Sequence, residues 1–263
     1  MSRRRVHVAL LAAALGLCGG AVVHAQPPAA SVEGLTRESQ LIFQGTVDRP
    51  SASNVALVQA GKDTAVVRVD AAIQVPGLLE VYAGQEVTLK LRQPGSVKAG
   101  DQAVFFTRGW LYGESLALIE AGHMAIGPAV ASQVAAARRK MATEAVQKRL
   151  DAAVLAVAGR VIETRASAVP ERRRGTEHDP MWREAVIAVD RVLKGDPQTS
   201  RVVLLFPTSN DVSWHGALKP QSGQDGIWIL EPSPAAPGKF IAPTAWHLMA
   251  REDLAMVERL VKP

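Results

Sequence analysis

The chain has little cysteine, few aromatic residues and no hydrophobic run long enough to cross a membrane. Its 263 residues include one cysteine, Cys18, and aromatic residues make up 5% of the sequence. Because Cys18 lies in an N-terminal segment that we expect to be removed, the mature chain has no thiol for a disulfide. Each domain must therefore be held together by its apolar core.

The first 25 residues have the composition of a secretory signal peptide. Three arginines, Arg3 to Arg5, precede an apolar run from Val8 to Leu17, and Val23-His24-Ala25 suits cleavage after Ala25. The run is too short to span a bilayer. We expect a periplasmic or secreted protein with no stable membrane span, exported by either the Sec or the twin-arginine route.

Charge of one sign is not in large excess. The whole chain carries a formal charge of +5, from 30 basic and 25 acidic residues. Three of the basic residues lie in the signal segment, so the remainder carries +2. A nucleic-acid binder needs a concentrated basic face, and this balance argues against nucleic acid as a partner.

The chain does contain an internal repeat. Short segments of the first half return in the same order in the second half, and their offset grows from 114 to 124 residues, as loop insertions would produce. The matched segments are Leu41–Val47 with Val154–Val161, Ala65–Asp70 with Ala185–Asp190, Gly100–Phe106 with Gly223–Ile229, and Gly122–Met124 with Trp246–Leu248. Colinear repetition of this kind predicts a duplicated domain.

Each copy is predicted to form five short strands followed by a helix. Segments rich in Val, Ile, Leu and Phe are separated by Gly, Pro, Asn and Asp. The expected strands are 41–47, 64–73, 85–91, 102–111 and 115–121, then 154–164, 182–193, 201–206, 226–231 and 240–243. Helical spacing of apolar residues follows each set, from Val130 to Ala145 and from Arg251 to Val261. Five strands per copy indicate a small closed barrel.

Three motifs of the second copy carry a family resemblance. They are Gly159-Arg160-Val161 at a strand, the segment from Val189 to Pro197 that closes in Leu-Lys-Gly-Asp-Pro, and Gly223-Gln224-Asp225-Gly226 before an apolar strand. Together they resemble the secreted bacterial relatives of the netrin/TIMP-like branch of the OB fold. The first copy lacks the Lys-Gly-Asp-Pro turn. The N-terminal cysteine with which animal members inhibit metalloproteases has no counterpart here, so that activity does not carry over.

The repeat and the resemblance together predict the organisation of the chain. We expect a mainly β protein with accessory helices, built from two tandem five-stranded OB-like barrels that are each followed by a helix. The parts are a signal peptide at 1–25, a flexible leader at 26–33, a first domain at 34–150 and a second domain at 151–263.

Aromatic residues near strand ends are the first candidates for a binding surface. Trp110 and Tyr112 in the first copy, and Trp182 and Trp214 in the second, fall near predicted strand ends or loops. Such side chains make good anchors for a peptide, a glycan or a base. Packing in the core or under a helix explains them about as well, and for Trp228, inside an apolar strand, the core is the better interpretation.

A charged loop between the first two strands of the second copy is another candidate. Arg172, Arg173 and Arg174 would favour an anionic partner. Glu177-His178-Asp179 groups three residues of metal-ligand type, but adjacent side chains point in different directions and the arginines would repel a cation. We therefore predict no metal site and no cofactor.

The remaining polar clusters do not predict catalysis. His123 and His247 occupy equivalent places in different copies, which favours structural histidines. The segment from Ser209 to His215 holds serine, aspartate and histidine, but it has no Gly-x-Ser-x-Gly elbow to expose a nucleophile. We predict no catalytic residue.

The leading hypothesis is a non-catalytic extracytoplasmic binding protein whose partner is a protein or a cell-envelope component. One alternative is a secreted hydrolase that uses polar loops of the second copy, with His178 or His215 as the reacting group. Another is a carrier that holds a small ligand in the mouth of one barrel.

Overall fold

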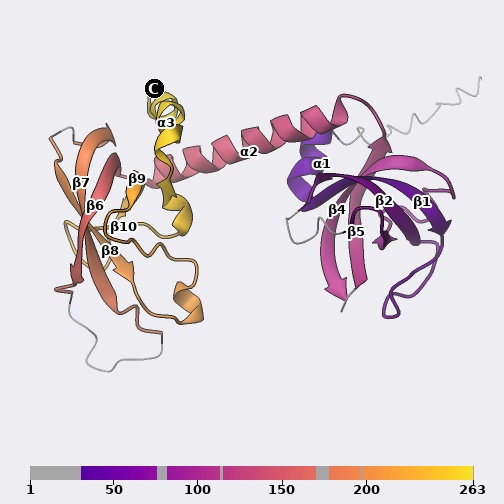
Figure 1. Ribbon diagram of the computed structural model, residues 1–263, viewed down its shortest axis with the longest axis horizontal. Coiled ribbons are helices and arrows are strands. Elements are labelled where there is room, and N and C mark those ends of the chain that lie inside the picture. Colours follow the sequence, from indigo (N-terminus) through magenta and orange to yellow (C-terminus); the bar gives the residue numbers. More distant parts are fainter. Residues whose placement is uncertain (1–30, 76–81, 113–114, 170–177, 197, 263) are drawn as a thin grey trace, which may run out of the picture.

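Two β-barrels lie at opposite ends of one long helix, α2 (Val130–Ala152) (Figure 1). The computed structural model describes residues 31–75, 82–112, 115–169, 178–196 and 198–262, and for residues 110–112 and 115 it describes the backbone alone. The expected signal peptide lies outside these residues. Within them, none of the helices combines the length and the apolar character that crossing a membrane requires.

The first barrel closes in the order β1-β2-β3-β5-β4. Its strands are β1 (Leu41–Pro50), β2 (Thr64–Gln74), β3 (Glu86–Lys90), β4 (Gln102–Tyr112) and β5 (Ser115–Ala125). β3 and β5 run parallel, whereas the other neighbouring pairs are antiparallel.

The second barrel repeats this topology. Its strands are β6 (Leu155–Ala166), β7 (Trp182–Lys194), β8 (Arg201–Pro207), β9 (Asp225–Pro232) and β10 (Phe240–Ile241). β10 pairs parallel with β8 and antiparallel with β9, which closes the ring as β5 does in the first barrel. The predicted fold class, two five-stranded barrels each followed by a helix, is confirmed.

The two copies differ at their last strand. In the first barrel β5 is one continuous strand of 11 residues. In the second, its counterpart is divided into β10 and a two-residue strand, β11 (Leu248–Met249), and the short helix η3 (Ala245–His247) lies between them. The strand expected at 240–243 therefore ends at Ile241, and a short connection leads to η3, in which Trp246 is exposed and His247 is buried.

A glycine in the first strand of each barrel allows the sheet to coil. The pairing register of β1 with β2 shifts at Gly45, and that of β6 with β7 shifts at Gly159. A Cβ at Gly45 would lie 2.8 Å from the carbonyl oxygen of Arg68, and a Cβ at Gly159 would lie 2.3 Å from that of Ala188. Any side chain at either position would collide with the backbone of the neighbouring strand, which explains why both copies have glycine there.

Each barrel has one core inside it and a second core between its outer face and the helices. In the second barrel, Trp228 is fully buried and donates its Nε1 proton to the carbonyl oxygen of Gly159 at 2.8 Å. Trp228 is therefore a core residue, as predicted. The outer cores hold Leu35, Ile42, Phe106 and Val134 in the first copy, and Leu150, Ala156, Ile229 and Val257 in the second.

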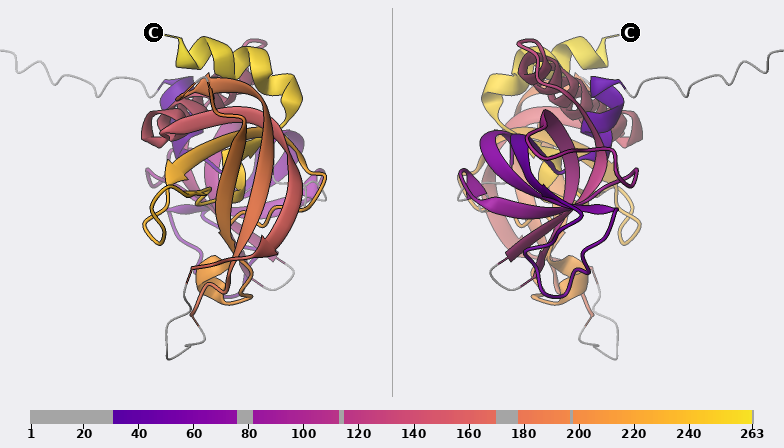
Figure 2. Two further views of the ribbon diagram at one scale, coloured as in Figure 1. Left: turned by 90° about the vertical axis from the view of Figure 1, so that its left-hand side faces the viewer. Right: turned by 90° about the vertical axis from the view of Figure 1, so that its right-hand side faces the viewer.

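The long helix α2 belongs to both copies. Its first turns pack with α1 (Val32–Glu38) on the first barrel, and its last turns pack with α3 (Leu254–Val261) on the second. The helices gather along one side of each barrel (Figure 2). One continuous helix thus serves as the last helix of the first copy and the helix that precedes the first strand of the second. The expected domain boundary at 150/151 falls within its last turn.

Candidate functional site

Two of the four predicted aromatic candidates meet at one end of the second barrel. Trp182 begins β7, and Trp214 ends the short helix η2 (Val212–Trp214). Their ring centroids are 5.7 Å apart with an interplanar angle of 65°, an edge-to-face contact. Trp214 also donates its Nε1 proton to the carbonyl oxygen of His178 at 2.8 Å. Both rings are half-buried, so they hold the loop in place as well as facing solvent.

Hydrogen bonds fix the loop that carries Trp214. The Asp211 carboxylate accepts from the backbone N–H of Ser213 at 2.8 Å, and its other oxygen lies 3.1 Å from Nδ1 of His178. Hydrogen bonds from Ser213 and from His178 lower the pKa of Asp211. Lys219 donates to the carbonyl oxygen of Ser209 at 2.8 Å. The loop is therefore held in one shape although it lies at the surface.

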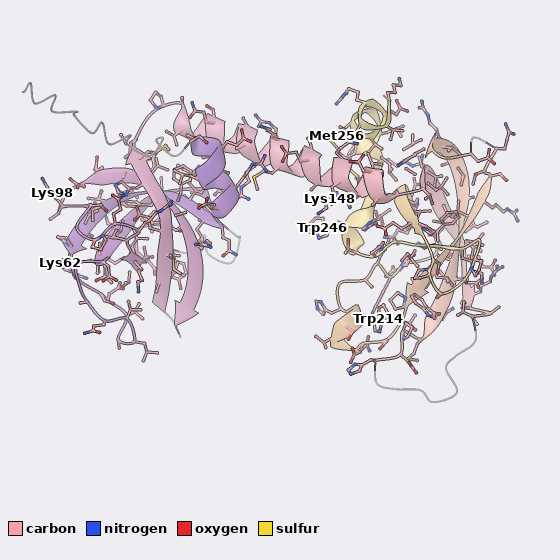
Figure 3. The ribbon with its side chains drawn as sticks, turned by 180° about the vertical axis from the view of Figure 1, so that it is seen from behind. Lys62, Lys98, Lys148, Trp214, Trp246 and Met256 are labelled. Atoms are coloured by element: carbon pink, nitrogen blue, oxygen red, sulfur yellow. The ribbon has the colours of Figure 1, made fainter. Side chains whose placement is uncertain are left out.

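This fixed loop presents apolar side chains to solvent. Val212 at its apex is 83% exposed, and Trp246 in η3 is 74% exposed. The two segments are joined where the backbone N–H of Ala245 donates to the carbonyl oxygen of Gly216 at 3.2 Å. We call Val212, Trp214, His215 and Trp246 the Trp246 edge. It lies on the side of the second barrel that faces the first (Figures 1 and 3).

Val212 and Trp246 were not among the residues predicted from the sequence. One signal for Trp246 was present, because the repeat places Gly122 at the same point of the first copy. A Cβ at Gly122 would lie 2.8 Å from Leu35 of α1, so the first copy packs this position closely under a helix. A tryptophan cannot occupy such a position, and in the second copy it lies in the loop that interrupts the strand.

The polar contacts of the loop do not form a catalytic triad. His178 and Asp211 do pair as a base and its orienting carboxylate would. However, the hydrogen bonds of Ser213 go to Asp211, and the Ser209 hydroxyl accepts from the backbone N–H of Asp211 at 3.2 Å. His215 is exposed. These contacts position the loop and place no serine hydroxyl as a nucleophile.

The two histidines of the repeat have similar local roles and different surroundings. Nδ1 of His123 contacts the buried carboxylate of Glu120, and this hydrogen bond raises the pKa of His123. Nδ1 of His247 lies 3.0 Å from the hydroxyl of Thr244, and burial lowers the pKa of His247. Nε2 of His247 is buried with no hydrogen-bond partner among the described residues, 3.4 Å from the carboxylate of Glu231.

The other predicted site residues are only partly described. Trp110 and Tyr112 lie in β4 opposite Ala117 and Ser115, but their side chains are outside the described part of the chain, as are Arg172, Arg173 and Arg174. In the described ranges, no group of three His, Cys, Asp or Glu residues is arranged to hold a metal ion.

The mouth of the first barrel contains a shallow apolar hollow. Its enclosed space is about 10 Å³, room for about one water molecule, and its lining includes Leu41, Phe43, Val69, Val75, Tyr82 and Val87. Ligand pockets in proteins usually enclose about 300–1,000 Å³. The hollow is therefore far smaller than a ligand pocket, and its lining side chains would have to move to admit a ligand.

No family model and no curated protein matches the chain.

Proposed function

We propose that the protein is an exported, non-catalytic binding protein that acts in the periplasm or outside the cell and recognises a protein or a cell-envelope component. The Trp246 edge is its recognition surface. We also propose that both barrels belong to the netrin/TIMP-like branch of the OB fold, an assignment that the Gly-x-Val motifs and the strand order β1-β2-β3-β5-β4 support.

One observation carries this proposal: large apolar side chains are exposed on a loop that hydrogen bonds hold rigid. Solvent-exposed valine and tryptophan contribute little to folding, whereas tryptophan is enriched among the residues that dominate protein interfaces. A loop that is already ordered loses little conformational entropy on binding. Both properties favour Val212 and Trp246 as contact residues for a partner.

The test is capture of a partner from envelope extract by the mature protein at moderate salt. The variant V212S/W246A should weaken capture by roughly 30-fold, since interface hot spots contribute about 2 kcal/mol or more. Leu57→Ala is the matched control, because Leu57 is 80% exposed on the first barrel and should leave capture unchanged. The proposal fails if no partner survives moderate salt, or if both variants capture it as well as the original protein does.

A carrier of a small apolar ligand is the second candidate, and the apolar lining of the hollow in the first barrel favours it. A thermal-shift screen with a metabolite library should then raise the unfolding temperature of the mature protein. Phe43→Trp, which would fill the hollow from β1, should remove that shift.

A secreted hydrolase is the third candidate, and the pair formed by His178 and Asp211 is the observation in its favour. Replacing His178 or His215 by alanine should then abolish turnover of the hydrolysed substrate and leave the circular dichroism spectrum unchanged.

A further inference from the structure

The Trp246 edge is bordered by positive charge. Lys148 on α2 and Lys219 after η2 are both exposed, and neither forms an ion pair within the described residues. Lys219 is anchored on the loop by its bond to the Ser209 carbonyl oxygen. Figure 3 shows Lys148, Trp246 and Trp214 in succession along one side of the second barrel. One lysine, Lys148, thus follows Trp246 along this side, and the other, Lys219, is fixed to the loop that carries Val212.

The carboxylates on the same elements contact groups other than the two lysines: on α2, Glu144 pairs with Arg37, and Asp151 accepts from Gln147 at 2.8 Å. Asp211 lies against His178 at 3.1 Å, and Glu231 lies against His247 at 3.4 Å. Among the described residues, none of these carboxylates forms an ion pair with Lys148 or Lys219. The edge therefore presents an apolar surface with unpaired positive charge beside it.

We propose that the Trp246 edge binds an acidic peptide segment that carries large apolar side chains. This assignment rests on the proposed function and names the partner class for that surface. The apolar side chains of the segment cover Val212 and Trp246, and its carboxylates pair with Lys148 and Lys219. Such charge complementarity selects partners and raises association rates.

Other polyanions fit the surface less well. Anionic lipid surfaces and nucleic acids attract clusters of several basic residues, and this edge offers two lysines beside exposed valine and tryptophan. A short peptide matches both parts of the surface at once. Anionic vesicles remain useful as a comparison probe.

The experiment measures binding of three labelled peptides of about 12 residues to the full mature chain by fluorescence anisotropy. The first contains glutamate and leucine, the second has lysine in place of glutamate, and the third has serine in place of leucine. We expect the first to bind at least tenfold more tightly than either of the others, and its affinity to fall about tenfold in Trp246→Ala.

The double variant K148E/K219E should reverse the preference toward the lysine peptide. Lys62→Glu is the matched control, because Lys62 is an exposed lysine on the first barrel, distant from the edge (Figure 3). It should leave the preference unchanged. Circular dichroism of each variant checks that the barrels remain folded.

Three results would overturn the assignment: equal binding of the glutamate and lysine peptides, an equal effect of Lys62→Glu, or tighter Trp246-dependent binding to vesicles of phosphatidylglycerol than to the first peptide. If envelope capture still depends on Trp246 in these cases, the proposed function stands and the acidic partner class is wrong. If capture is independent of Trp246 as well, both proposals are wrong.

Discussion

At the scale of single residues, Glu184 is a buried acidic side chain of β7, on the face opposite the inner-core residues Ala185 and Ile187. It is 3% exposed, and its carboxylate accepts hydrogen bonds from Arg165 at 3.0 Å, from Ser167 at 3.2 Å and from Lys239. Burial alone would raise the pKa of this carboxyl, but the hydrogen bonds from Lys239 and Arg165 outweigh burial and lower the pKa to about 2. The charged form is therefore favoured in the folded protein.

This depressed pKa predicts an acid-sensitive second domain. The stabilisation is fully present above the unfolded-state pKa of 4.5 and is lost as the pH falls from 4.5 toward 2. About 3 kcal/mol is at stake, since one pKa unit corresponds to about 1.4 kcal/mol. Urea unfolding followed by tryptophan fluorescence should show this loss in Trp110→Phe, whose four other tryptophans all lie in the second copy.

Glu184→Gln supplies the control for that experiment. The amide cannot ionise, so its unfolding free energy should be lower at neutral pH and should change less between pH 4.5 and 2. An equal acid slope in both proteins would contradict the role given to Glu184.

At the scale of elements, each of the two outer cores contains a valine from the helix that covers the barrel, and the two valines occupy equivalent places. Val134 of α2 and Val257 of α3 are each almost fully buried, one against the first barrel and the other against the second. The repeat thus extends from the strands to the helices that cover them.

Truncating either valine should destabilise only its own barrel. Val134→Ala and Val257→Ala each remove two methyl groups from a packed core, which costs about 2 kcal/mol. In the Trp110→Phe background, Val257→Ala should lower the urea midpoint seen by fluorescence, and Val134→Ala should leave it nearly unchanged. Equal shifts would show that the barrels unfold as one unit.

Sequence patterns predicted the strands well because their residues obey local rules. The apolar alternation and the glycines at 45 and 159 reflect constraints within a strand pair, and these are visible in the sequence. The division of the last strand into β10 and β11 was not predicted. In the first copy, Gly122 packs closely against Leu35 of α1, and a tryptophan would not fit at the equivalent position of the second copy. Such packing joins residues that are distant in the sequence.

The candidate site was predicted only in part, for a related reason. Trp214 and Trp182 were singled out because they are aromatic residues near strand ends. Val212 was not, because exposure of a valine depends on the loop geometry set by Asp211 and His178. Chemical type is readable from sequence, whereas exposure in a loop is set by tertiary contacts.

At the scale of the whole molecule, α2 sets the distance and the orientation between the barrels. Ion pairs from α1 to Lys140 and Glu144 fasten its middle turns, and burial of Val146 and Leu150 fastens its last turns. The helix continues without interruption through both sets of contacts. The helix therefore transmits any change in its length to the second barrel.

Inserting one alanine between Ala145 and Val146 should turn the second barrel by about 100° relative to the first and move it by about 1.5 Å. Seven alanines, close to two turns, should nearly restore the orientation and add about 10.5 Å. Because the mature chain is expected to be free of cysteine, spin labels at Leu57→Cys and Ile162→Cys can report the distance between the barrels. A broad distribution unaffected by either insertion would show that α2 does not hold the barrels in a fixed relation.

The sharing of α2 also limits how the gene can recombine. A crossover that exchanges one barrel for that of a distant homologue must keep each apolar stripe of α2 with the barrel on which it packs. Otherwise one barrel of the chimera is covered by a helix surface that does not fit it. Such a chimera should be joined at Ala145, between Glu144, which pairs with α1, and Val146, which packs on the second barrel.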